Sequence, residues 1–148
     1  MIILVAISEP SSGQPTLARA AELAVVSQAE VVVLHVRERH YARGVVWDEP
    51  APADAAELLN EATYDLRRQN IACRGAVRLA RAGRVAEAIV SAAVDLQAHL
   101  IVLGRSPERS LTRLMTANTS QRVVRLAPMP VLVVPRASTI RLAVPSAR

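Results

Sequence analysis

The residues most suited to binding chemistry lie late in the chain, in the segment 104–117 and at the start of the helix expected after it. Asn118 and Gln121 are three residues apart, the spacing of a capping box, in which each side chain bonds a free N–H of the first helical turn. A helix start also carries the positive end of the helix dipole, which attracts anions such as phosphate. Further positive charge comes from Arg105, Arg109 and Arg113. The pattern indicates either a phosphate site or a capped surface helix whose arginines face solvent.

Other kinds of site chemistry find little support in the sequence. The three histidines lie on different expected elements, and none has a cysteine or a carboxylate cluster at metal-ligand spacing. We therefore expect no metal site, and we expect His35 to pack at the end of a buried strand with its ring hydrogen-bonded. The Gly-x-Ser-x-Gly motif of serine hydrolases is absent, and no carboxylate or histidine is evidently placed to orient a water. No catalytic residue is predicted.

The chain has 148 residues, of which 51% are apolar and 21% charged, so we expect one domain with a core of its own. Cys73 is the only cysteine, which excludes an internal disulfide and fits a reducing compartment. No apolar run approaches the ~18–20 residues of a membrane-spanning helix, and the apolar start is too short for a signal peptide. We expect a soluble, cytoplasmic protein that has no membrane partner.

The net charge is +5, and every one of the 18 basic residues is arginine. A basic chain raises the question of nucleic acid, but a stacking platform for single strands needs aromatic residues between the basic ones. The aromatic residues are only Tyr41, Trp47 and Tyr64. We therefore expect no specific nucleic-acid binding. The same shortage of rings disfavours a flavin site in the hydroxyl-rich segment 11–16.

Five short runs rich in valine, isoleucine and leucine are expected to form strands. Four of them are nearly continuous, which is typical of strands covered on both faces in a parallel sheet. The third contains Arg74 and Arg78, so we expect it at an edge of the sheet with one side wet. The runs cover residues 2–7, 31–36, 71–79, 100–103 and 131–134.

Segments with helical periodicity separate these runs and cover residues 15–29, 53–69, 84–98 and 118–127. Pro15 suits the first turn of the first helix, and Val25 falls on its apolar stripe. In the last helix, Val123 and Val124 are expected to face inward. The alternation predicts an α/β fold: a single-domain, open, doubly wound, parallel five-stranded sheet with helices on both faces.

A ligand of such a sheet lies beyond the carboxyl ends of the strands, where the strand order reverses. The first strand borders that point in either common order, so the loop after Ile7 belongs to the expected crevice. In the order 3-2-1-4-5, the loop after Leu103 lies beside it.

The segment 37–50 is a polar connector, longer than the about 2–6 residues usual between a strand and a helix. It contains His40, Tyr41 and Trp47. Our main interpretation is a tolerated surface insertion. A lid over the crevice and a contact with a partner are the alternatives.

Several short motifs, which together span nearly the whole chain, match the pattern of a known protein family. They are Gly104, the helix start NTSQRV at 118–123, the ending APMPVLVV at 127–134, and the weaker pieces ILVAI at 3–7, LHV at 34–36 and AEAI at 86–89. Together they resemble the universal stress protein family. The resemblance implies the strand order 3-2-1-4-5, a homodimer formed through the last strand, and a stress-response role in bacteria or archaea that works through contacts with an unidentified client protein.

The resemblance also defines where the sequence departs from members of the family that hold ATP. Those members share a loop of glycine, two residues, glycine, nine residues, glycine and then serine or threonine, together with an aspartate after the first strand. Gly104 occupies the first glycine position, but Pro107, Ala117 and Asn118 stand at the next three, and Ser8 follows Ile7 without the aspartate.

These departures weaken the phosphate end of the site. A proline has no N–H to offer a phosphate, and an alanine forced into the left-handed conformation costs about 1–2 kcal/mol. Loss of a charge-assisted N–H contact adds about 1.5–3 kcal/mol. The sum, roughly 2.5–5 kcal/mol, lowers affinity by about 10² to a few thousandfold. We therefore expect ATP to bind weakly or not at all.

For a nucleotide that does bind, the resemblance implies a set of contact residues. It places the adenine by Ile7, Ser8 and the backbone of Val36, the ribose by Leu103 and Gly104, and the phosphates by Asn118, Thr119 and Ser120. The alternative function is an ATP- or AMP-binding switch of the same family that uses a rearranged phosphate loop. Slow ATP hydrolysis remains open in either case, although the chain is not expected to be an enzyme.

The last apolar run predicts how the sheet ends. It would leave an edge open to pairing with another chain, so we expect a homodimer through Val131, Leu132, Val133 and Val134. We assign residues 1–137 to the α/β domain and residues 138–148 to a C-terminal tail. Ile140, Leu142 and Val144 alternate with other residues there, which would suit an added edge strand.

Overall fold

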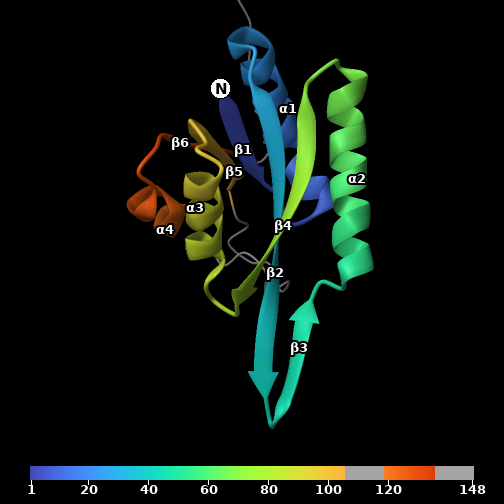
Figure 1. The fold of residues 1–148 in the computed structure, drawn as a ribbon, viewed down its shortest axis with the longest axis vertical. Helices are drawn as coiled ribbons and strands as arrows, with labels where there is room; N and C mark the ends of the chain where they lie inside the picture. Colours follow the sequence, from blue (N-terminus) through green and yellow to red (C-terminus); the bar gives the residue numbers. More distant parts are fainter. Residues whose placement is uncertain (106–118, 136–148) are drawn as a thin grey trace, which may run out of the picture.

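The computed structural model describes residues 1–105 and 119–135. Within this range strands and helices alternate along the chain (Figure 1). The strands are β1 (Ile2–Ala6), β2 (Glu30–Ala42), β3 (Val45–Glu49), β4 (Cys73–Arg81), β5 (Leu100–Gly104) and β6 (Val131–Val134). The helices are α1 (Pro10–Ser27), α2 (Pro52–Arg68), α3 (Val85–Asp95) and α4 (Thr119–Leu126).

The five predicted strands form a parallel sheet in the order β4-β2-β1-β5-β6. This is the predicted order 3-2-1-4-5, and the α/β class is confirmed. β1 lies in the middle of the sheet, with β2 on one side and β5 on the other. The strand order therefore reverses at β1, which is the topological switch point of the sheet. β4 pairs only with β2 among the described residues, as expected for an edge strand.

Alternate residues of the central strands build two apolar cores, one on each face of the sheet. Ile3 and Val5 of β1 pack on the face covered by α1 and α2. Leu4 and Ala6 pack on the opposite face, against α3 and α4. Figure 1 shows α2 on one side of the sheet and α3 with α4 on the other. The strands are thus covered on both faces, which is why their sequences are almost continuously apolar.

The segment 37–50 corrects the sequence interpretation, because it is a β-hairpin rather than a plain connector. β2 continues past the body of the sheet, turns at Arg43 and Gly44, and returns as the antiparallel strand β3 (Figure 1). Both turn residues have positive φ, 49° and 78°, as a two-residue type I′ turn requires. Arg39 donates from Nε and an η nitrogen to the two carboxylate oxygens of Asp48, at 2.8 and 3.0 Å. Within residues 1–105 and 119–135 the sheet therefore has six strands and is mixed, not five and wholly parallel.

Three details of the predicted helices are also wrong. α1 begins at Pro10, where the missing proline N–H is unpaired in any case, and Pro15 lies inside the helix. Val25 and Val124 are exposed because each lies one residue, about 100° of rotation, after a buried Ala24 or Val123. The apolar stripes of α1 and α4 are therefore narrower than the sequence suggested.

Candidate functional site

The predicted adenine and ribose contacts lie at the carboxyl ends of three neighbouring strands. Ala6, the last residue of β1, pairs with Leu34 of β2 on one side and with Leu103 of β5 on the other. Ile7 and Ser8 follow β1 directly, and Gly104 ends β5. The fold thus brings the carboxyl ends of β1, β2 and β5 together, as the strand order predicts.

A hollow opens at the carboxyl ends of these strands, on the face of the sheet that α3 covers. It encloses about 230 Å³ of space, counting its open mouth. Three of the predicted contacts, Ile7, Ser8 and Val36, line it, whereas Leu103 and Gly104 do not. Its complete lining is Ala6, Ile7, Ser8, Leu34, Val36, Val85 and Ile89.

The sequence analysis missed the wall that α3 contributes to this hollow. Val85 and Ile89 are one helical turn apart at the start of α3 and are almost fully buried. Their i, i+4 spacing in the sequence predicted that both face the core, but not which strand they contact. That this helix turn lies against the end of β2 follows from the tertiary arrangement alone.

The backbone of β2 has an unpaired stretch beside the hollow. β4 occupies one edge of β2 as far as Arg39, so β3, which pairs from Glu38 onward, uses the same edge as β1. On that edge the last bond from the β1 side is the Ile7 N–H donating to the Leu34 carbonyl, at 3.0 Å. Val36 lies between the two pairings, and its main-chain groups face the gap, since alternate residues of a strand bond to the same side. No strand covers this gap within the described part of the chain.

His35 holds the end of β1 in place. Its Nδ1 lies 2.9 Å from the Ile7 carbonyl oxygen, so the neutral ring carries its proton on Nδ1 and donates it to that carbonyl. Burial lowers the pKa of His35, the bond to Ile7 opposes this shift, and the positive charge of Arg37 adds to it. The ring is 1% exposed. The prediction of a packed, hydrogen-bonded histidine is confirmed.

Only part of the predicted phosphate end falls within the described residues. Thr119 and Ser120 form the start of α4 and are buried. Arg122 pairs across to Glu87 of α3, which fixes the helix against its neighbour. Asn118, Pro107 and Ala117 lie outside the described residues, so the capping box and the phosphate loop stay predictions.

Neither a metal-ligand cluster nor a membrane-spanning helix occurs in the part of the chain that the structure describes. Among residues 1–105 and 119–135, no three histidine, cysteine, aspartate or glutamate side chains are grouped so that they could hold a metal ion. No helix in the same ranges has the length and apolar character needed to cross a membrane.

The Cys73 thiol is half-buried and lies 3.4 Å from the Thr63 carbonyl, and burial raises the pKa of this thiol. A raised pKa leaves little reactive thiolate.

Comparison with known proteins places this arrangement among related chains. Residues 1–135 match the profile of the Universal stress protein family. A universal stress protein from Synechocystis sp. is 31% identical over 121 residues, which cover 78% of this chain and 73% of that protein.

Solved structures show the same fold. A universal stress protein from Archaeoglobus fulgidus is 25% identical, with a TM-score of 0.71 over 90% of this chain and 98% of that one. A family protein from Burkholderia pseudomallei is 30% identical, with a TM-score of 0.66 over 90% and 95%. An Archaeoglobus fulgidus universal stress protein solved with dAMP is 23% identical, with a TM-score of 0.67 over 90% and 97%.

Proposed function

The chain belongs to the universal stress protein family, and on that premise we propose that it is a cytoplasmic, homodimeric stress-response module that binds ATP weakly or not at all and acts through contacts with a client protein. The observation that carries this proposal is a contrast between the two ends of the strand-end crevice. The end that would hold a base is suited to one, whereas the end that would hold phosphates is altered.

The base end combines a backbone edge with apolar walls. The main-chain groups of Val36 face a gap that no described strand fills, and a backbone N–H and C=O can pair with the edge of a base. Leu34, Val85 and Ile89 supply an apolar surface for a flat ring.

The phosphate end lacks the residues that make an ATP loop. Pro107 removes an N–H donor, and Ala117 and Asn118 replace the glycine and the hydroxyl residue that ATP-holding members carry. The expected loss, about 10² to a few thousandfold in affinity, moves a micromolar ATP site to millimolar or nearly so. The nucleotide therefore keeps its base contacts and gains little from its phosphates.

The test compares ATP with adenosine, because the two ligands share the base and the ribose but not the phosphates. We expect both to bind the natural chain with similar, near-millimolar affinity in a titration followed by NMR of the Ser8 and Val36 amides. The triple substitution Pro107→Gly, Ala117→Gly and Asn118→Ser restores the loop. It should tighten ATP binding by at least about 10²-fold and leave adenosine unchanged.

Several outcomes separate this proposal from its alternatives. Stoichiometric ATP, ADP or AMP released from the purified natural chain on denaturation would overturn it, and so would an ATP affinity far above that of adenosine. A change in adenosine affinity in the triple variant would show that the substitutions act on more than the phosphates. The substitution Ser106→Gly in the same loop is the matched control and should leave both affinities within about twofold.

The alternative is an ATP- or AMP-binding switch of the same family with a rearranged phosphate loop. It is favoured by one observation, that Ile7, Ser8 and Val36 line a common hollow although they come from different parts of the chain. A switch requires nucleotide-dependent change elsewhere in the molecule. Nucleotide-dependent shifts of amides at the opposite end of the sheet, such as Glu30 and Cys73 at the starts of β2 and β4, would support the switch.

A further inference from the structure

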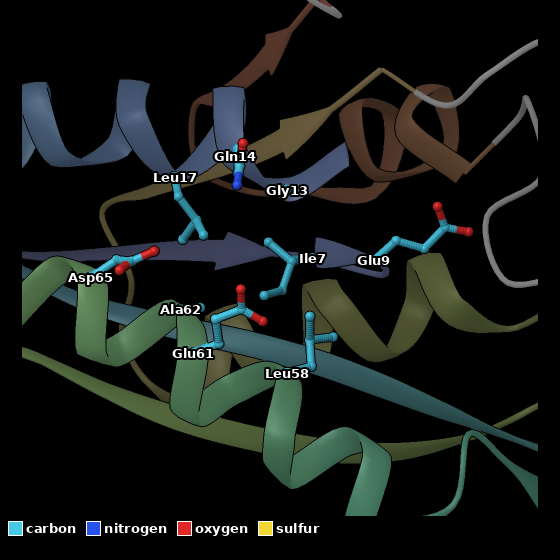
Figure 2. Close-up of a pocket in the computed structure, with 9 residues that line it drawn as sticks. All are labelled: Ile7, Glu9, Gly13, Gln14, Leu17, Leu58, Glu61, Ala62 and Asp65. Atoms are coloured by element: carbon cyan, nitrogen blue, oxygen red, sulfur yellow. The ribbon is translucent and has the colours of Figure 1, made fainter. Parts of the chain in front are cut away.

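The β2–β3 hairpin extends past the body of the sheet (Figure 1). In the body, α1 and α2 cover one face, and Ile7, Leu17 and Leu58 point toward one another around a small cavity between these two helices (Figure 2). No described helix lies over the turn of the hairpin (Figure 1). We call residues 38–49, which form the hairpin ladder and its turn, the arm. Residues 41–47 of the arm are all exposed.

The outer strand of the arm, β3, is an apolar strand with an unprotected edge. Val45 and Val46 are 59% and 53% exposed, and Trp47 is 37% exposed. Among the described residues β3 pairs only with β2, so its other edge is open. Proteins usually protect such edges with lysine, proline, a bulge or a covering segment, because an open edge pairs readily with another strand. Residues 45–47 contain neither a charge nor a proline. This edge is therefore suited to pairing with a strand of another molecule.

The register of the arm determines which main-chain groups face outward. The residues that flank a two-residue turn form a hydrogen-bonded pair, and bonded pairs alternate with non-bonded pairs from there on. Ala42–Val45 and His40–Trp47 are therefore bonded pairs. The N–H and C=O groups of Val46 and Asp48 consequently point away from β2. These two residues are spaced as an added antiparallel strand requires.

The two ends of β3 carry opposite charges that lack a charged partner of their own. Arg43, in the turn before β3, makes no ion pair with the described residues. Glu49, at the end of β3, accepts a bond from the Trp47 Nε1 at 3.1 Å and lies 3.9 Å from the His40 Nε2. No arginine of the described ranges pairs with Glu49. A strand that complements this edge must bring a carboxylate to Arg43 and a cation to Glu49.

We propose that the strand that complements this edge is β3 of a second copy of this chain, paired antiparallel about a two-fold axis at Val46. In this register the two copies of Val46 face each other, and each Val45 faces a Trp47 of the other copy. Each Arg43 then faces a Glu49, so both unpaired charges find a partner. Because the interface is symmetric, every one of these contacts except the central one occurs twice.

Other antiparallel registers fit less well. An axis at Trp47 places Glu49 opposite Val45 and Asp48 opposite Val46, so two carboxylates lie against apolar side chains. An axis at Asp48 places the two copies of its carboxylate opposite each other, which is destabilising. The register centred on Val46 is the one that joins the apolar residues to one another and the charges to their opposites.

The proposed contact is small and is additional to the proposed homodimer through β6. β3 has five residues, whereas stable interfaces bury about 1,200–2,000 Å². We therefore expect the arms to pair only at high protein concentration. In a β6 homodimer each molecule carries a free arm, so pairing of arms would join dimers into tetramers or longer chains.

Charge reversal tests the register. Sedimentation of the natural chain up to about 500 µM should show an association step that grows with concentration, and the fluorescence of Trp47, the only tryptophan, should change with it. Arg43→Glu brings carboxylates together at both ends of the interface, and Glu49→Arg brings cations together. Each should weaken this step by about tenfold or more. An equimolar mixture of the two variants restores opposite charges at both ends, so it should associate within about threefold of the natural chain.

The matched controls change the net charge by the same amounts away from the β3 edge. Arg81 lies on β4, on the other side of β2 from β3, and Glu57 is exposed on α2. Arg81→Glu, Glu57→Arg and their mixture should associate as the natural chain does. Val133→Pro, which blocks the proposed β6 contact, should reduce the arm-dependent step to a monomer–dimer equilibrium that the same charge reversals weaken. Failure of the β6 dimer and failure of arm pairing are thereby told apart.

Three results would overturn the proposal. The first is a natural chain with no concentration-dependent step up to about 500 µM. The second is a mixture of the Arg43 and Glu49 variants that associates no better than either variant alone. The third is protection of the Val46 and Asp48 amides from hydrogen exchange by added cell extract but not by a high concentration of the chain itself. This third result would show that the edge pairs with a different protein.

Discussion

At the scale of single residues, His35 is the buried titratable group with the clearest task. Its Nδ1–H bond to Ile7 ties β2 to the end of β1, next to the crevice. Its Nε2 is buried and has no hydrogen-bond partner in the described part of the chain. Burial of the ring is the main cause of the lowered pKa of His35 in the folded protein, and the charge of Arg37 adds to it.

This pKa shift predicts a pH-dependent stability. In the unfolded chain His35 binds a proton near pH 6.5, whereas in the folded chain it does so only at lower pH. Its contribution to the free energy of unfolding is therefore fully present above about pH 6.5. It is lost as the pH falls from there toward the lowered pKa, with a slope of at most about 1.4 kcal/mol per pH unit. Urea unfolding between pH 7.5 and 5 should show this loss in the natural chain.

The substitution His35→Gln keeps a donor for Ile7 and removes the titration, so its stability should change less over the same pH range. His99, which is exposed and accepts a bond from the Ile2 N–H, provides the control. His99→Gln should retain the pH slope of the natural chain. An unchanged slope in the His35 variant would show that another group carries the effect.

At the scale of elements, the packing of α2 on β4 depends on a missing side chain. A Cβ placed on Gly75 of β4 would lie 3.2 Å from the Cβ of Leu59, closer than ordinary van der Waals contact. Leu59 is buried in the core under α2. The helix therefore sits close to an edge strand that otherwise carries arginines, and the glycine sets that distance.

We expect Gly75→Val to lower the free energy of unfolding by about 1–2 kcal/mol, because overpacking at about 1–3 kcal/mol outweighs the gain of a β-branched residue in a strand. Thermal or urea unfolding measures this loss. Leu59→Ala alone should cost about 2–5 kcal/mol through the cavity it leaves. The double variant should lose about 1 kcal/mol less than the two single losses added together, because Leu59→Ala removes the Cδ1 and Cγ atoms that would lie 3.4 and 3.6 Å from the new Cβ. Strictly additive losses would show that these two atoms do not limit the space at Gly75.

At the scale of the whole molecule, the two ends of the sheet differ. The β4 edge carries Arg74 and Arg78, which pair with Glu30 and Asp95, and charged side chains of this kind discourage pairing with another strand. β6 is a run of four aliphatic residues that pairs only with β5 within the described ranges. This asymmetry supports the proposed homodimer through β6.

The backbone of β6 suggests a sharp test of that dimer. The Pro130 and Val134 carbonyls accept bonds from β5, so the main-chain groups of Val131 and Val133 face the open edge. Val133→Pro removes an outward N–H and leaves the β5 side intact, and it should convert a dimer into a monomer in sedimentation experiments at micromolar concentration. Val133→Ala, which keeps the N–H, should remain dimeric. A natural chain that sediments as a monomer would refute the proposal.

The sequence by itself determined the frame of this protein. Nearly continuous apolar runs mark strands that helices cover on both faces, and the alternation of runs and helical segments leads to a parallel sheet. The position of His35 at the end of a buried run was enough to predict a packed ring. These features could be predicted because the periodicity of apolar residues along the chain indicates which residues are buried.

The tertiary structure alone decided which surfaces meet. The β2–β3 hairpin was missed because residues 37–40 are four polar residues in a row, without the alternation of apolar and polar residues that marks a strand. Arg39 contacts Asp48 only once the cross-strand register is set. The gap at Val36 exists only because β1 ends before β3 begins on the same edge. The cavity between α1 and α2 arises from residues more than forty positions apart, such as Leu17 and Leu58. Sequence spacing indicates which face of its helix or strand a residue occupies. The shape of the space between two packed elements depends on how closely they approach each other, which spacing does not give.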